Sequence, residues 1–219
     1  MIVRESVRNF ITQKHILELI DDSKYEQMYD ECPYLLRGGV TDLLLDCDVK
    51  PDEYMTVLPS DYLCGSEIET YNISSTITRI MSSAFYDCRY LKNISIPHGV
   101  THIDHAAFSG CSSLTEIVLP NSLIEIGYDA FKECTSLESI IIPSSVTYIS
   151  SSFNNCNNLK NVDVYTTFVN LSPGAFTGCS NLNIKFAGTR SQWRQIATGK
   201  FKGCIYTCTC TDGIIKKSR

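Results

Sequence analysis

Residues 84–97 read AFYDCRYLKNISIP, and this arrangement of apolar positions returns again and again along the chain. A phenylalanine recurs every 22 or 23 residues, a cysteine follows it after three residues, and a leucine follows after three more. The recurring residues are Phe85, Phe108, Phe131, Phe153 and Phe176; Cys88, Cys111, Cys134, Cys156 and Cys179; and Leu91, Leu114, Leu137, Leu159 and Leu182. Self-similarity at a short fixed period predicts a solenoid in which equivalent side chains of successive coils stack into one core.

Each repeat also contains a predicted strand. After Leu91 the chain reads Ile94-Ser95-Ile96-Pro97, an alternation that is typical of a short strand with one buried face. Similar alternations follow at residues 117–120, 140–143 and 162–164. Counting back one period from the first phenylalanine places a degenerate coil near Val57, so we expect an α/β repeat solenoid of about six coils of 22–23 residues.

The motif Ala84-Phe85-x-x-Cys88-x-x-Leu91-x-x-Ile94-x-Ile96-Pro97 and its copies resemble the BspA-type leucine-rich repeat, over about residues 57–215. The end of the chain is also similar to the closing segment common in that family, with Phe186-Ala187-Gly188-Thr189, Gln192-Trp193 and Cys210-Thr211-Asp212-Gly213. The resemblance implies a leucine-rich-repeat-like stack that binds other proteins and carries no shared catalytic residue. It also implies two kinds of relatives, secreted adhesins and small intracellular members encoded by phages.

Both ends of the predicted solenoid depart from the repeat. Apolar residues at helical spacing predict helices over about 2–20, from Ser23 to the residue before Pro33, and from Val40 to before Pro51. At the other end alternating cysteines and an Asp212-Gly213 turn predict a closing hairpin. We therefore expect three parts: an acidic helical N-terminal cap over 1–56, the solenoid over 57–186, and a C-terminal capping segment with a basic tail over 187–219.

Composition excludes several classes of protein. The chain has 219 residues, of which 43% are hydrophobic, and no apolar run exceeds three residues, so we expect a packed core and no membrane span. Without an apolar run typical of a signal peptide near its start, we expect a cytoplasmic protein, in the host cytoplasm if a phage encodes it. A pI near 5.4 argues against a nucleic-acid partner.

Charge is distributed unevenly. Residues 1–56 carry 6 Lys and Arg against 12 Asp and Glu, residues 57–182 carry 5 against 11, and residues 183–219 carry 8 against 1. The chain is therefore acidic over most of its length and basic at its end, a polarity that can orient a charged partner.

Candidate chemistry is sparse. Five of the eleven cysteines occupy one repeat position, where we expect a buried, reduced ladder. Cys204, Cys208 and Cys210 leave open an alternative, a metal-binding or redox protein, although their spacing matches no zinc motif. We expect exposed loop positions for His98, His102 and His105 rather than metal ligands. No nucleophile, phosphate loop or paired-carboxylate motif stands out, so we predict no catalytic residue, no metal and no cofactor.

The predicted partner site lies on the outward side of the repeat strands, the expected concave face of the solenoid. Its residues are Glu116, Val118, Ser139, Ile141, Asn161 and Asp163, in which two neighbouring aliphatic side chains have a polar rim. A secondary edge consists of His102, His105, Tyr128 and Tyr148. The sequence thus predicts a non-enzymatic protein-protein interaction module, with a phage-encoded inhibitor of a host or defence protein as its sharper form. An exported bacterial cell-surface adhesin is the alternative.

Overall fold

The structure is a computed structural model that describes residues 56–167, 170–201 and 204–218. The helices expected within residues 1–55 lie outside the described residues. Thirteen strands and one helix make up the regular elements of the described part. The elements are β1 (Val57–Leu58), β2 (Thr70–Asn72), β3 (Arg79–Ile80), β4 (Asn93–Ser95), β5 (His102–Ile103), β6 (Glu125–Ile126), β7 (Ser139–Ile142), β8 (Tyr148–Ile149), β9 (Asn161–Val164), β10 (Asn170–Leu171), β11 (Leu182–Phe186), α4 (Arg190–Ala197), β12 (Tyr206–Cys210) and β13 (Gly213–Lys217).

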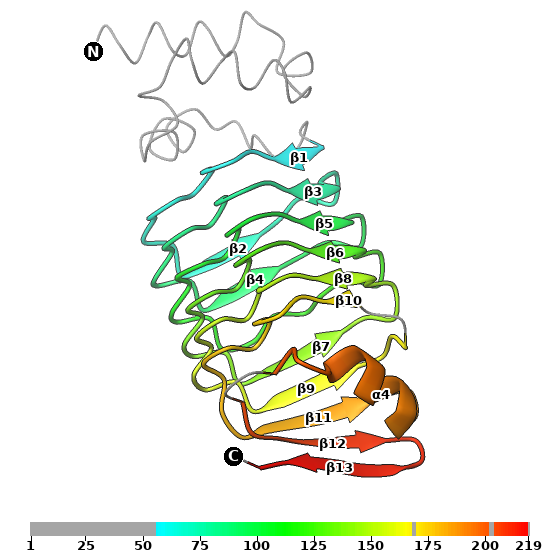
Figure 1. Cartoon of the computed structure of the whole chain (residues 1–219). Helices are drawn as coiled ribbons and strands as arrows, with labels where there is room; N and C mark the ends of the chain where they lie inside the picture. Colours follow the sequence, from blue (N-terminus) through cyan, green and yellow to red (C-terminus); the bar gives the residue numbers. More distant parts are fainter. Residues whose placement is uncertain (1–55, 168–169, 202–203, 219) are drawn as a thin grey trace, which may run out of the picture.

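The strands form ladders along two sides of a stack of coils (Figure 1). One side is a six-stranded sheet in the order β1-β3-β5-β6-β8-β10, and the other side contains the pair β2-β4 and a five-stranded sheet in the order β13-β12-β11-β9-β7. Neighbouring strands are parallel except for the β12–β13 hairpin, which is antiparallel as expected. The architecture confirms the predicted repeat solenoid.

The register of the ladders follows the sequence period. Ile80 pairs with Ile103, Ile103 with Ile126, and Ile126 with Ile149, so equivalent residues of successive coils lie side by side. All four isoleucines are buried. A parallel ladder brings equivalent positions to the strand spacing of about 4.8 Å, which is the distance at which identical apolar side chains pack against each other.

Aromatic rings form the centre of the core. From Phe85 to Phe176 each repeat phenylalanine stacks on the next, with centroids 5.0–5.3 Å apart and planes within 6° of parallel. Beside them the cysteine thiols donate to backbone carbonyls of the preceding coil; Cys134 Sγ, for example, lies 3.2 Å from the Phe108 oxygen. The predicted phenylalanine, cysteine and leucine ladders therefore share one buried core.

The ladder has a sixth member that the period did not reveal. Phe201 stacks on Phe176 at 5.3 Å, and Cys204 Sγ donates to the Phe176 carbonyl at 2.8 Å. The spacing from Phe176 to Phe201 is 25 residues, longer than the other intervals of 22 or 23, and α4 lies within this interval. The Phe-x-x-Cys spacing itself is unchanged and is the signal that could have identified this coil.

Two local expectations were wrong or incomplete. The alternation at residues 117–120 predicted a strand, but no strand forms there, although Ile117 and Leu119 still point into the core. Alternation reports which side chains are buried and not whether the backbone joins a ladder. The helix α4 was not predicted; it begins at a Thr189 cap whose hydroxyl accepts from the Gln192 amide, and it buries Trp193.

Candidate partner-binding face

Four of the six predicted partner residues lie on the adjacent strands β7 and β9. Ser139 pairs with Asn161 and Ile141 pairs with Asp163 across β7 and β9. Glu116 and Val118 occupy the equivalent positions of the preceding coil. Burial of the intervening residues turns all six side chains away from the core, so the structure brings the predicted set together on one surface; five are exposed and Asp163 is half-buried. We call this surface the outward face.

Two aliphatic side chains are prominent on the outward face. Val118 is 79% exposed and Ile141 is 54% exposed, whereas their neighbours Ile117 and Ile140 are buried. Each aliphatic residue borders a hollow. Val118 lies at one of about 290 Å³ lined also by Tyr71, Asn93 and Glu116, and Ile141 lies at another of about 380 Å³ whose lining includes β9, β11 and β12 side chains. The aliphatic pair thus lies between two concave regions.

Charge surrounds this apolar pair. Glu116 is exposed on the Val118 side. On the other side Lys185 of β11 pairs in register with Asp163, and its Nζ lies 3.6 Å from a carboxylate oxygen. Lys185 belongs to the same face. Its ion pair with Asp163 depends on the register between β9 and β11, which the sequence pattern does not give. The rim therefore carries the exposed acid Glu116 at one end and the Asp163–Lys185 ion pair at the other.

The secondary edge is a different surface: His102 and Tyr148 lie on strands of the six-stranded sheet, and His105 and Tyr128 lie in turns that follow β5 and β6. His102 pairs in register with Glu125, and Glu125 with Tyr148. The rings of His105 and Tyr128 stack at 5.7 Å with planes 1° apart. His102 is a correction to the expectation of a loop residue, because it lies half-buried on β5 with its Nδ1 2.9 Å from the Thr101 hydroxyl.

Tyr148 is half-buried on this edge, as His102 is, and its hydroxyl lies 3.1 Å from Ser172 Oγ. On this edge His105 and Tyr128 are therefore in contact with each other, whereas the Tyr148 hydroxyl contacts Ser172 of the next coil.

The cysteines of the described residues are free thiols, and most of them are buried. Burial raises the pKa of Cys156 to about 12 and raises the pKa of Cys134 well above its ordinary value. Buried neutral thiols are poor nucleophiles and poor metal ligands. The ladder is therefore a packing element.

The three C-terminal cysteines do not form one group. Cys204 belongs to the core ladder, where it donates to Phe176, whereas the Cys208 and Cys210 sulfurs lie 3.7 Å apart on β12. Within the described residues, no three His, Cys, Asp or Glu side chains are grouped as a metal site. The same part of the chain has no helix with the length and apolar character needed to cross a bilayer.

Comparison with solved structures places the solenoid among bacterial proteins. A leucine-rich repeat protein from Bacteroides ovatus is 31% identical, with a TM-score of 0.51, over 60% of this chain and 35% of that one. The T. pallidum leucine-rich repeat protein is 31% identical, with a TM-score of 0.52, over 55% of this chain and 59% of that one. A leucine rich cell surface protein from Faecalibacterium prausnitzii is 33% identical, with a TM-score of 0.57, over 61% of this chain and 36% of that one.

This chain therefore spans between about a third and three fifths of the length of these proteins. No curated protein matches the sequence significantly. Residues 56–183 match six copies of the BspA type leucine rich repeat region. Since the matched region covers more than half of the sequence and has the stacked coils seen in the structure, the chain belongs to the BspA-type leucine-rich repeat family.

Proposed function

We propose that this protein is a non-enzymatic binding module that holds a partner protein against its outward face. The fold is typically used for protein-protein interaction, and the family is generally non-enzymatic. The observation that carries the proposal is the exposure of Val118 and Ile141 in consecutive coils. An aliphatic pair with a polar rim has the anatomy of a binding hot spot, in which a few apolar side chains are desolvated at the centre of an interface.

The rigidity of the solenoid supports this use. Backbone hydrogen bonds hold β7, β9 and β11 in one parallel ladder, so their outward side chains are spaced by the fold rather than by the partner. A surface that is ordered before binding loses less conformational entropy when the complex forms.

The test is an affinity pulldown from the native host, compared between the wild-type protein and a Val118→Asp/Ile141→Asp variant. A matched control is Ile124→Asp, which places the same charge on another exposed aliphatic residue outside the outward face. We expect one protein to be retained by the wild type and by the control and lost by the double variant. Retention of that protein by all three would contradict the assignment of the face.

A second double variant tests whether the partner binds the secondary edge instead of the outward face. His105→Ala/Tyr128→Ala removes the stacked rings on the six-stranded side and leaves the outward face intact. If this variant loses the partner and the Val118→Asp/Ile141→Asp variant keeps it, the interface lies on the secondary edge.

The sharper form of the proposal is an inhibitor that a phage encodes and that acts on a host or defence protein in the host cytoplasm. The acidic body and basic end of the chain support a partner that is recognised in one orientation. A map of the neighbouring genes tests this form: phage genes on both sides are expected, and a surface-protein operon would contradict it.

An exported adhesin is the second candidate, and one comparison favours it, since the F. prausnitzii relative is described as a cell surface protein. Fractionation of the native host separates the two candidates. Recovery with the cell surface supports the adhesin, and recovery in the cytoplasm supports the intracellular module.

A further inference from the structure

The strand β13 lies at the end of its sheet. It is the terminal member of the order β13-β12-β11-β9-β7, at the end of the stack of coils (Figure 1). It pairs with β12 on one side, and no strand of the described residues lies on the other side. One side of the β13 backbone is therefore open to a further strand.

The hairpin register shows which backbone groups lie on the open side. Cys210 pairs with Gly213 across a two-residue turn, so these two residues exchange the hydrogen bonds that close the hairpin. Hydrogen-bonded pairs alternate along an antiparallel ladder, and Ile215 belongs to the next one. The amides and carbonyls of Ile214 and Lys216 therefore point away from β12, and no other described group bonds to them. We call these four backbone groups the open edge.

Two exposed side chains border the open edge on the outward face. Ile214 lies opposite Thr209, and Lys216 lies opposite Thr207, both of which alternate with the buried residues of β12. Ile214 is 56% exposed, so it has apolar surface that a neighbouring strand can cover. Cross-strand pairs of aliphatic residues and of opposite charges both stabilise a sheet. The open edge thus combines backbone donors and acceptors with one aliphatic side chain and one cation.

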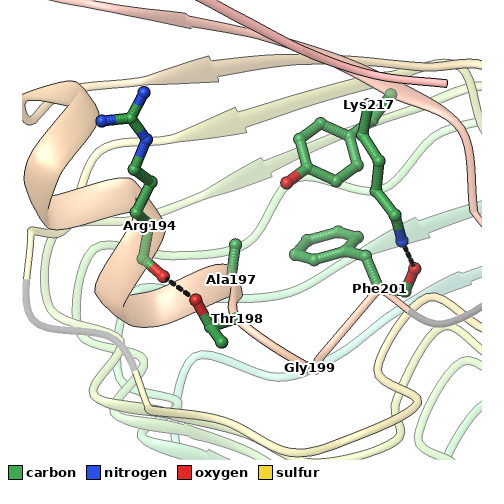
Figure 2. Close-up of a pocket in the computed structure, with 7 residues that line it drawn as sticks. Arg194, Ala197, Thr198, Gly199, Phe201 and Lys217 are labelled. Carbon is green, nitrogen blue, oxygen red and sulfur yellow. Dashed lines mark hydrogen bonds between the residues drawn. The ribbon is translucent and has the colours of Figure 1, made fainter.

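The charge of this part of the chain indicates the charge of the missing strand. Residues 183–219 carry eight Lys and Arg and one acid, Asp212, which accepts from the first amide of α4 at 2.6 Å. The Lys217 ammonium lies on the other side of β13, where it donates to the Phe201 carbonyl (Figure 2). Lys216 is exposed, and within the described ranges no salt bridge joins it to an acid. A strand beside β13 is therefore favoured when it is acidic.

We propose that the open edge binds an extended acidic segment of another polypeptide, which adds a strand to the sheet beside β13. The backbone of this segment pairs with Ile214 and Lys216, an aliphatic side chain packs beside Ile214, and a carboxylate pairs with the Lys216 ammonium. A second copy of the chain fits less well, because it would bring the lysines of two β13 strands together, and lysines on an edge strand oppose such pairing.

The probe is the fluorescein-labelled peptide Thr-Glu-Val-Val-Glu-Thr, which reads the same in both directions and so fits a parallel or an antiparallel arrangement. Fluorescence anisotropy follows its binding to the full chain at low ionic strength, where surface charges are least screened. Two further peptides carry glutamine or lysine in place of both glutamates. We expect saturable binding of the acidic peptide, affinity about three- to tenfold weaker for the glutamine peptide, and no saturation with the lysine peptide. Equal affinities for all three would overturn the proposal.

A methylated peptide separates strand pairing from simple attraction of charges. N-methyl groups on the two glutamate and two valine amides keep both carboxylates and both aliphatic side chains but remove four hydrogen-bond donors. We expect this peptide to show no saturable binding. If it binds as tightly as the acidic peptide, the backbone does not pair with β13 and the proposal is wrong.

Amide hydrogen exchange measured by NMR locates the peptide on the strand. In the free chain the Ile214 and Lys216 amides should exchange rapidly, whereas the Ile215 amide is already bonded to β12. With saturating acidic peptide we expect exchange at Ile214 and Lys216 to slow by about tenfold or more, with little change at Ile215. Protection of β7, at the opposite end of the sheet, without protection of these two amides would contradict the assignment.

A charge reversal tests the contribution of Lys216. Lys216→Glu is compared with Lys160→Glu, which makes the same change on an exposed side chain directly before β9. We expect Lys216→Glu to weaken binding of the acidic peptide by about tenfold or more and to bind the lysine peptide, and Lys160→Glu to retain the wild-type affinities. Equal affinity of both variants for the acidic peptide would overturn the role of Lys216. Circular dichroism checks folding, and if Lys216→Glu does not fold, the wild-type comparison of the peptides decides.

Two further measurements separate this inference from its alternatives. Light scattering gives the mass of the free chain, and a dimer that the acidic peptide dissociates would assign the open edge to a second copy instead. The Val118→Asp/Ile141→Asp variant should bind the acidic peptide with wild-type affinity, because neither residue lies on β13. Failure of the peptide to bind therefore overturns the open-edge proposal and leaves the test of the outward face unaffected.

Discussion

Phe131 lies parallel to Phe108, with ring centroids 5.3 Å apart and planes that differ by 2°. Both rings are fully buried and belong to consecutive coils. The contact is repeated along the whole stack, so each ring contacts a neighbour on either side. Removing one ring therefore leaves a cavity that interrupts the core between two halves of the solenoid.

Phe131→Ala is expected to lower the free energy of unfolding by about 3–5 kcal/mol, because it deletes a fully buried ring in the middle of the stack. Tyr128→Ala, three residues earlier on an exposed position, should cost less than about 1 kcal/mol. Urea unfolding followed by circular dichroism measures both. Similar losses for the two variants would contradict a core built on the phenylalanine ladder.

Two neighbouring residues in the third coil should differ strongly in how much the same substitution lowers stability. Ile117 is 6% exposed and Val118 is 79% exposed. Ile117→Asp buries an unpaired carboxylate and should cost more than about 3 kcal/mol, whereas Val118→Asp should change stability by less than about 0.5 kcal/mol. Thermal unfolding of the two variants tests whether residues 115–119 keep their alternation without a strand. A large loss from Val118→Asp would place that side chain in the core.

The cysteine ladder should make stability depend on alkaline pH. Burial raises the pKa of Cys156 to about 12 in the folded chain, from an ordinary value near 9. Between these values the unfolded chain has lost the proton and the folded chain has kept it, so the stabilisation present below about pH 9 decreases as the pH rises towards 12. The Cys156→Ala variant lacks this pH-dependent contribution to the free energy of unfolding.

The comparison is between the unfolding free energies of the wild type and of Cys156→Ala at about pH 8 and about pH 10. The wild type is expected to lose about 1 kcal/mol more than the variant over this interval. An equal loss of unfolding free energy in the two proteins would contradict this prediction, because it would mean that Cys156 ionises over the same pH range in the folded and the unfolded chain. Cys64→Ala is the comparison, and it should remove a smaller part of the loss, because Cys64 is only partly buried although burial also raises its pKa.

The cap of α4 should be measurable by itself. Thr189 Oγ1 accepts from the Gln192 amide at 3.3 Å, and Gln192 Oε1 accepts from the Thr189 amide at 2.8 Å. Thr189→Ala removes one half of this capping box and should lower stability by about 1 kcal/mol. Ser191→Ala, on an exposed side chain of the first turn, is the control and should have little effect. Trp193 emission during thermal unfolding follows the helix directly.

Much of the fold could be predicted because the repeat is regular. The Phe-x-x-Cys-x-x-Leu spacing indicated which side chains face the core, and the ladders bear this out. The sixth ring, Phe201, was missed because an insertion lengthens its interval to 25 residues. The helix α4 was missed because eight residues are too few for a helical apolar period to stand out.

The candidate surfaces were only partly predictable. Alternation placed Val118 and Ile141 outward, since a strand period of two assigns each side chain to one face. It did not reveal the hollows beside them or the ion pair of Asp163 with Lys185, which depend on how coils are aligned. The contacts at the C-terminal end of the stack were not predictable, because Arg194 and Lys217 follow no repeat and Phe201 lies outside the period of 22 or 23 residues.

The sequence by itself determined the period, the buried ladders and the outward residues of each coil, because a fixed spacing of apolar side chains admits one way of stacking coils into a shared core. The tertiary structure alone decided where the stack ends and what lies beside its last ring. The β12–β13 hairpin lies beside α4 there and brings together Phe201, Tyr206 and Lys217. Such a contact between segments outside the repeat depends on three-dimensional packing, because no local sequence pattern encodes it.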